Sequence, residues 1–199
     1  MDGIPTEVLV GIFQWVPFRW LIHVSQVCRH WREICKETRF SLFNFPRSLT
    51  HTCAELIVPN FSSFSRLVID EAGIGDKTLE LFSRWNLKSL ELFNCFNITN
   101  RGLAALSLPC LENFFLFFDN PMQGLNITDE TLDILARNCP LLKKFRVSKC
   151  GNLTGEGFGR LVGNCPALEY VYLYMSPGMR TIFSKPNVIE TLIIDHCIT

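Results

Sequence analysis

Residues 142–147 read Leu142-Lys143-Lys144-Phe145-Arg146-Val147, an L-x-x-L-x-L pattern with a bulky apolar residue at each fixed position. The pattern occurs six times, at intervals of 23, 24, 31, 26 and 21 residues, starting at Phe64, Leu87, Leu111, Leu142, Leu168 and Ile189. Side chains alternate between the two faces of a strand, so the second half of each pattern predicts a short strand with its fixed residues buried. Intervals centred on about 20–29 residues are typical of repeat proteins in which each unit adds one strand to a shared sheet.

The sequence between successive strands predicts one helix per repeat. Spaced Leu, Ile, Ala, Val or Phe residues fill the four segments 76–85, 99–108, 128–138 and 154–164. Thr99, Thr128 and Thr154 occupy the same turn before three of these helices. Threonine is a common N-cap, so each is expected to cap the helix that follows.

Cysteines recur at fixed places in the repeats. Cys95, Cys150 and Cys197 follow their strands at the same offset, and Cys139-Pro140 and Cys165-Pro166 end their helices. In this the chain resembles the cysteine-containing leucine-rich repeats that often follow an F-box. The resemblance implies an α/β solenoid with parallel strands on the concave face and helices on the convex face.

The N-terminal residues carry a second, helical pattern. Pro5 suits the first turn of a helix, and Val8, Leu9, Ile12, Phe13 and Val16 recur at helical spacing before Pro17 ends the run. Leu21, Val24, Cys28 and Trp31 then recur at steps of three and four. Two or three short helices bury too little surface to enclose all these side chains. Some are therefore expected to face a partner or the following domain.

This stretch, from Ile4-Pro5-Thr6-Glu7-Val8-Leu9-Val10-Gly11-Ile12-Phe13 to Val27-Cys28-Arg29-His30-Trp31, resembles the F-box. The resemblance implies a Skp-type adaptor as partner and, through it, a cullin ubiquitin ligase. The residues that match adaptor-docking positions of the family are Ile4, Pro5, Leu9, Ile12, Phe13, Val16, Leu21 and Val24. Trp31 and Ile34 are expected to hold the helices together instead. Trp20 departs from the family, which usually has a polar or acidic residue there.

These patterns predict two domains, a helical F-box at 1–46 and leucine-rich repeats at 47–199. The repeat domain is expected to have about six strands and an incomplete last repeat. Residues 40–46 are expected to bridge the domains, and Leu56-Ile57-Val58, followed by Pro59, predicts a first short strand. The third repeat has an insertion at 120–124, and the fifth is short and lacks the cysteines. Because the last strand has no following helix, the chain is a short isoform, a fragment, or capped by something else.

The residues between the fixed positions of each strand are expected to line the concave face. All three tyrosines lie on one strand, beside a strand with two cations and a strand with two phenylalanines. Aromatic and arginine side chains are common interface anchors. The predicted substrate-binding patch consists of Phe115, Phe117, Lys144, Arg146, Tyr170, Tyr172 and Tyr174. The alternative is that tyrosines simply suit strands and are shielded by the unusual fifth repeat.

Composition and spacing argue against several other kinds of function. The chain has 19 basic and 19 acidic residues, so nothing favours nucleic acid, and no apolar run approaches the length of a membrane span. Nine cysteines without a C-x-x-C pair indicate reduced thiols in the cytoplasm or nucleus. His196-Cys197 lacks a third catalytic group, and Cys28, His30 and Cys35 lack zinc spacing. We therefore expect no catalytic residue, no metal and no cofactor.

Together these features predict a non-enzymatic substrate receptor of a Skp-cullin-F-box ubiquitin ligase. The adaptor would bind the F-box and a target protein would bind the repeats. Two alternatives stay open. One is a repeat scaffold with a degenerate F-box, which the departure at Trp20 favours, and the other is a truncated competitor that binds adaptor but no substrate.

Overall fold

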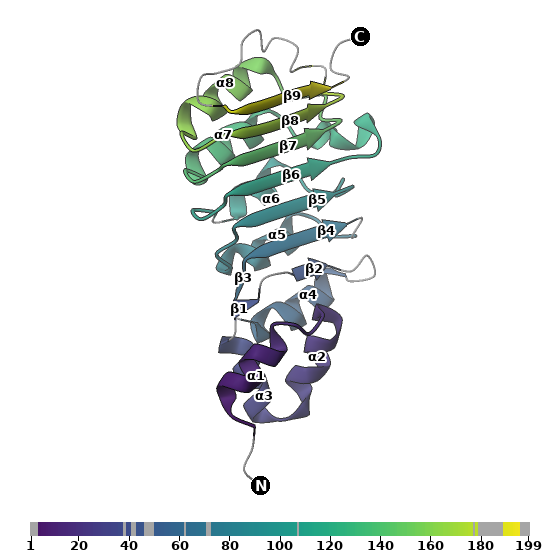
Figure 1. Cartoon of the computed structure of the whole chain (residues 1–199). Helices are drawn as coiled ribbons and strands as arrows, with labels where there is room; N and C mark the ends of the chain where they lie inside the picture. Colours follow the sequence, from purple (N-terminus) through teal and green to yellow (C-terminus); the bar gives the residue numbers. More distant parts are fainter. Residues whose placement is uncertain are drawn as a thin grey trace.

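The computed structural model describes residues 4–37, 39–40, 43–45, 50–61, 63–70, 73–106, 108–176, 178 and 189–195. They form an elongated molecule with a group of helices at the N-terminal end, from which a sheet extends (Figure 1). The N-terminal helices are α1 (Thr6–Phe13), α2 (Phe18–Val27) and α3 (Arg29–Glu37).

Proline begins two of these helices. Pro5 is the N-cap of α1, and its carbonyl oxygen accepts the N–H of Leu9 at 3.1 Å. Pro17 is the N-cap of α2, and its carbonyl oxygen accepts the N–H of Trp20 at 2.8 Å. Cys28 then adopts an extended conformation, with φ −158° and ψ 171°, and separates α2 from α3. The predicted apolar pattern from Leu21 to Trp31 therefore lies on two helices.

The repeats form one parallel sheet of seven strands in the order β2-β4-β5-β6-β7-β8-β9. The six predicted strands are confirmed as β4 to β9, and their fixed residues are buried in β4 to β8 and partly buried in β9, at Leu192 and Ile194. A separate two-stranded parallel sheet joins β1 (Arg39–Phe40) to β3 (Ser63–Phe64). The strands of the large sheet are β2 (Phe43–Phe45), β4 (Arg66–Asp70), β5 (Ser89–Phe93), β6 (Asn113–Phe117), β7 (Lys144–Ser148), β8 (Tyr170–Tyr174) and β9 (Thr191–Asp195).

The expectation of a strand at Leu56-Ile57-Val58 is wrong. These residues belong to α4 (His51–Ile57) and to the 3-10 helix η1 (Val58–Asn60). Ala54 and Val58 of this helical stretch are both buried, so its apolar side packs into the core. The first strand of the sheet is instead β2, which lies within residues 1–46 and pairs with β4.

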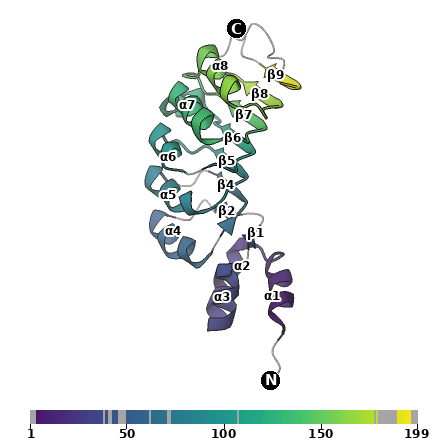
Figure 2. The same cartoon turned by 90° about the vertical axis from the view of Figure 1, so that its left-hand side faces the viewer.

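Helices cover one face of the sheet and leave the other open (Figure 2). They are α5 (Asp76–Leu81) with the 3-10 helix η2 (Phe82–Arg84), α6 (Asn100–Ala105), α7 (Asp129–Asn138) and α8 (Gly155–Asn164). The insertion in the third repeat forms a further 3-10 helix, η3 (Pro121–Asn126). Thr99, Thr128 and Thr154 cap α6, α7 and α8 as predicted, each accepting a backbone N–H through its hydroxyl. The core lies between the helices and the sheet, and the open side is the concave face.

A left-handed residue ends three of the strands. Asn94, Lys149 and Met175 have φ of 52°, 59° and 44°, and each is followed by a buried small side chain. Cys95 and Cys150 occupy this position as predicted, whereas Cys197 lies outside the described residues. In the fifth repeat Ser176 takes the place of the cysteine, and its hydroxyl accepts the N–H of Cys150 at 3.3 Å. The sequence prediction missed this substitution.

Candidate functional site

The predicted substrate-binding residues meet on the concave face of three neighbouring strands. Phe115 of β6 lies opposite Arg146 of β7, which lies opposite Tyr172 of β8. Lys144 is aligned with Tyr170, and Phe117 and Tyr174 are both aligned with Ser148. The register therefore brings all seven predicted side chains into one group, which we call the concave patch.

Arg146 lies at the centre of the concave patch. Its guanidinium carbon is 4.9 Å from the centroid of the Phe115 ring and 4.7 Å from that of the Tyr170 ring. The rings come from the strands on either side of β7, and such contacts attract a cation through the electron-rich face of the ring. The Nε atom of Arg146 is buried and has no hydrogen-bond partner among the described residues. The patch therefore presents a positioned cation.

Further aromatic and apolar side chains extend the patch on both sides. Phe93 of β5 stacks on Phe117 with ring centroids 5.2 Å apart, and Tyr172 stacks on Tyr174 at 6.5 Å. Ile193 of β9 is aligned with Tyr172 and is partly exposed. The sequence placed Phe93 and Ile193 on the concave face but did not include them in the candidate site. Both could have been included from sequence, because Phe93 is aligned with Phe117 and Ile193 with Tyr172, two residues of the predicted site.

The surroundings of Tyr172 favour the neutral form of its phenol. Burial raises the pKa of Tyr172 above its ordinary value, and the nearby Asp195, Tyr174 and Tyr170 raise it further, while Arg146 opposes them. A protonated phenol donates as well as accepts a hydrogen bond. Tyr172 can therefore bind either kind of polar group at physiological pH.

The N-terminal half of the concave face has a different character, because its charges pair with each other. The Nε and Nη2 atoms of Arg66 lie 2.6 and 3.0 Å from the two carboxylate oxygens of Glu91, and Ser89 donates to the same carboxylate at 3.2 Å. The pair is bidentate and Glu91 is buried. Arg66 and Glu91 already satisfy each other, so a binding partner would find fewer unpaired charges here than at the concave patch.

The eight predicted adaptor-binding residues fall into three groups by exposure. Leu9, Phe13 and Leu21 are buried in the chain's own core, and Phe13 packs edge-on against Trp31 with ring centroids 5.2 Å apart. Ile34 is also buried, as expected for a residue that holds the helices together. Val16 and Val24 are partly buried, whereas Ile4, Pro5 and Ile12 are exposed.

Further large apolar side chains are exposed in the same stretch of the chain, on α1 and α2 or directly beside α1. Val8, Trp15, Trp20 and Val27 are also exposed, and Trp15 most of all, at 88%. Trp20 lies beside His23, with ring centroids 5.8 Å apart. We call this set, with Ile4 and Ile12, the helical surface. Sequence reasoning missed Val8, Trp15 and Val27, because periodicity alone does not say which apolar side chains face inward.

The cysteines of the repeats have the environment of core residues. Burial raises the pKa of the Cys95, Cys139 and Cys150 thiols to about 12, and that of Cys165 to about 11. A neutral, buried thiol is a poor nucleophile and a poor metal ligand. Within the described ranges no group of three or more His, Cys, Asp and Glu side chains is arranged to hold a metal ion. His196-Cys197 lies outside those ranges.

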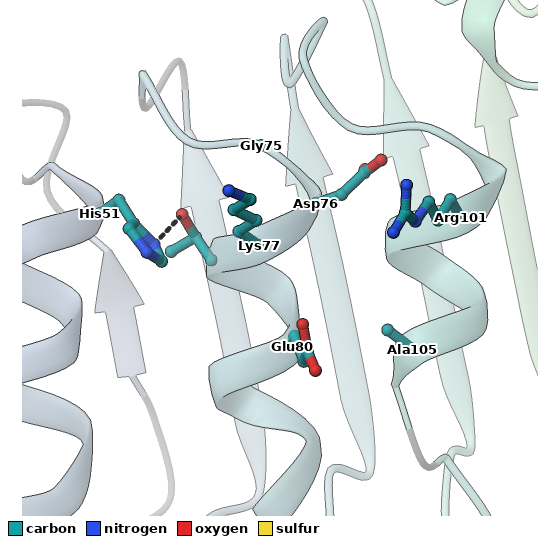
Figure 3. Close-up of a pocket in the computed structure, with 8 residues that line it drawn as sticks. His51, Gly75, Asp76, Lys77, Glu80, Arg101 and Ala105 are labelled. Carbon is teal, nitrogen blue, oxygen red and sulfur yellow. Dashed lines mark hydrogen bonds between the residues drawn. The ribbon is translucent and has the colours of Figure 1, made fainter.

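A pocket of about 450 Å³ lies on the convex side, among α4, α5 and α6 (Figure 3). His51 lies 3.1 Å from the Thr78 hydroxyl, and the Asp76 carboxylate accepts the N–H and hydroxyl of Thr99. The central polar groups of the pocket thus join neighbouring repeats.

None of the helices of the described residues is both long and apolar enough to cross a membrane.

Comparison with known proteins gives a consistent result. Residues 1–43 match the family model described as F-box-like. F-box/LRR-repeat protein 23 of Arabidopsis thaliana is 25% identical over 201 residues, covering 77% of this chain and 42% of that protein. F-box/LRR-repeat protein 21 of the same plant is 26% identical over 149 residues, covering 67% and 45%. The chain thus spans less than half the length of these relatives.

Among solved structures, the crystal structure of the Rad7 and Elc1 complex in yeast matches with a TM-score of 0.45 and 16% identity, covering 73% of this chain and 45% of that chain. The N-terminal match, the two relatives and the repeats seen in the sheet agree. The chain therefore has an F-box-like N-terminus followed by a repeat solenoid, and it is similar in sequence to F-box/LRR-repeat proteins.

Proposed function

We propose that this protein is the substrate-recognition subunit of a Skp-cullin-F-box ubiquitin ligase, acting in the cytoplasm or nucleus. Its helical surface binds a Skp-type adaptor and through it the cullin, and its concave patch binds the target protein. The subunit is not itself catalytic. It works by holding the target near the charged ubiquitin-conjugating enzyme, which raises the effective concentration of the reacting groups.

The observation that supports this proposal is the separation of two candidate surfaces, which lie at different places along the chain. The residues of the helical surface lie on or beside α1 and α2 at one end, and the concave patch lies on strands β6 to β8 of the solenoid (Figure 1). Large exposed apolar surfaces on soluble proteins usually mark interaction sites. A receptor needs two such surfaces, so that one partner does not displace the other.

The size of the helical surface bears on how sensitive adaptor binding is to mutation. Fully burying one large apolar side chain contributes about 1.5–3 kcal/mol, so six half-exposed ones contribute a gross gain on the order of 5–10 kcal/mol. Association costs about 4–15 kcal/mol in lost freedom. The margin is small, so a single buried charge on this surface is expected to abolish the complex.

The test is co-purification of the full chain with a Skp-type adaptor, for the wild type and for Ile12→Asp. Ile12 is 48% exposed, so the substitution changes the surface and spares the core. The matched control is Leu141→Asp, because Leu141 is 50% exposed but lies between α7 and β7 on the solenoid. We expect a one-to-one complex for the wild type and for Leu141→Asp, and none for Ile12→Asp.

A folded wild-type chain that does not bind any Skp-type adaptor would overturn the proposal. The second candidate function, an interaction scaffold without ligase assembly, would then take its place. Trp20 is the observation that favours the scaffold, since this bulky side chain is 53% exposed on the helical surface. Trp20→Ser then tests the cause: restored binding would show that Trp20 alone blocks docking, whereas a variant that still does not bind would leave the scaffold.

A further inference from the structure

The side chain of Arg146 is held in place before any ligand binds. Phe115 and Tyr170 contact its guanidinium from the two neighbouring strands, at 4.9 and 4.7 Å from the ring centroids. A free arginine side chain loses rotational freedom about several bonds when it binds a ligand, which costs entropy. Holding the side chain in place beforehand removes much of that cost. Rings that stack on a guanidinium cover its faces, while its N–H donors lie in the plane and stay available.

The charge of Arg146 is not neutralised within the described part of the chain. No carboxylate of a described residue forms an ion pair with it, and its buried Nε has no hydrogen-bond partner. Glu91, the acidic side chain in the same row of the concave face, already accepts both donors of Arg66. A guanidinium with no counter-charge of its own favours a ligand that brings an anionic acceptor.

The pair of Arg66 and Glu91 shows which ligand the geometry suits. On the same face, one guanidinium holds one carboxylate through two hydrogen bonds of 2.6 and 3.0 Å. Sites for phosphorylated peptides generally use clusters of arginines. On the concave positions of β6, β7 and β8, Lys144 is the other cationic side chain. A single arginine falls short of such a cluster, and the bidentate pair of Arg66 with Glu91 favours a carboxylate as its ligand.

We propose that Arg146 binds the side-chain carboxylate of an aspartate or glutamate in an extended segment of the target protein. Apolar neighbours of that residue pack against Phe117 on one side and against Tyr172 and Ile193 on the other. This inference rests on the proposed function, since the segment belongs to the target that the receptor recognises. It adds the chemical class of the segment, an acidic residue flanked by apolar ones.

The experiment pans a random peptide library displayed on phage against the immobilised full chain. Wild type is expected to enrich peptides with Asp or Glu next to aromatic or aliphatic residues. Arg146→Glu reverses the charge at the same place and is expected to enrich Lys or Arg instead. Arg160→Gln is the control, because Arg160 is on α8 of the convex face, where it pairs with Asp133.

The best wild-type peptide is then measured by fluorescence anisotropy. Arg146→Gln should weaken its binding between about tenfold and a hundredfold, the loss expected for hydrogen bonds to a charged group. Arg160→Gln should leave the affinity unchanged, and thermal unfolding followed by circular dichroism confirms that each variant is folded. Tyr170→Leu should weaken binding less than Arg146→Gln, since it removes one of the two contacts that hold the guanidinium.

Three results overturn the inference. One is that the wild type enriches no peptide or enriches peptides without an acidic residue, and another is that Arg146→Gln binds as tightly as wild type. The third is that the same peptide with phosphoserine in place of the acid binds more tightly, which would assign the site to a phosphate. Ile12→Asp should bind the peptide normally, so failure of adaptor binding and failure of this inference are separate outcomes.

Discussion

Asp129 of α7 holds the first turn of the next helix through Thr154. The two oxygens of its carboxylate accept the backbone N–H of Thr154 at 2.7 Å and the Thr154 hydroxyl at 2.5 Å. The same hydroxyl accepts the N–H of Gly157, which makes Thr154 the N-cap of α8. Asp76 and Thr99 repeat the arrangement between α5 and α6. Adjacent repeats are thus joined by side chains that also cap helices.

Replacing Asp129 by alanine is expected to destabilise the protein by about 1–3 kcal/mol, because two hydrogen bonds to a charged group are lost. The control is Asp133→Ala on the same helix. Asp133 forms an exposed pair with Arg160, and such pairs contribute no more than about 1 kcal/mol. Urea denaturation measures both changes in unfolding free energy. Equal losses would show that the Asp129 contact does not join the repeats.

Two glycines of α8 are expected to respond to alanine in opposite directions. A Cβ atom at Gly157 would overlap the Asp129 carboxylate, so Gly157→Ala should destabilise by about 1–3 kcal/mol. At Gly159 no atom lies within 4 Å of the added Cβ, so Gly159→Ala should stabilise the helix by about 0.5–1 kcal/mol. Thermal unfolding distinguishes them, and a loss of stability at Gly159 would contradict the packing described here.

Neighbouring residues of α1 should differ sharply in their effect on stability. Phe13 is buried against Trp31, so Phe13→Ala is expected to cost about 3–5 kcal/mol of unfolding free energy. Ile12 is exposed, and Ile12→Ala should change stability by less than about 0.5 kcal/mol. Chemical denaturation of the two variants provides the test. A large loss at Ile12 would mean that this side chain belongs to the core and not to the helical surface.

The buried cysteines should resist alkylation in the folded protein. Burial raises the pKa of the Cys95, Cys139 and Cys150 thiols to about 12, so the reactive thiolate is rare at mildly alkaline pH. Cys28 is exposed and is the reference. Mass spectrometry after iodoacetamide treatment should find Cys28 modified first and the other three only in denaturant. Rapid labelling of Cys95 in the native protein would contradict its structural role.

The pKa of Asp133 lies below its ordinary value because Arg160 donates hydrogen bonds to its carboxylate and attracts its charge. A carboxyl group with a lowered folded pKa stabilises the protein above its unfolded pKa, and this contribution is lost as pH falls through the folded pKa. Arg160→Gln should therefore raise the pKa of Asp133 in an NMR titration and weaken the acid dependence of stability. Glu112, whose pKa is lowered by Lys143, serves as the internal reference and should not shift.

Much of the candidate site followed from sequence because a parallel sheet fixes register by repetition. Once Leu142 and Phe145 are aligned with Leu168 and Val171, the alternating residues of the two strands, such as Lys144 and Tyr170, must lie side by side on the open face. The contact between Arg146 and Tyr170 did not follow, since these residues are diagonal neighbours rather than aligned partners. It depends on rotamers, which packing selects.

The sequence by itself determined the six repeat strands β4 to β9, the convex helices α5 to α8 and the three threonine caps, because each rests on local periodicity repeated through the chain. Tertiary structure alone decided three other features. Residues 56–58 lie in helical segments, in which Ala54 and Val58 face the core, and β2 is the first strand of the sheet. It also decided that Leu9 and Phe13 face inward while Ile12 faces solvent. Burial depends on what packs against a helix face, and short apolar segments do not encode that locally.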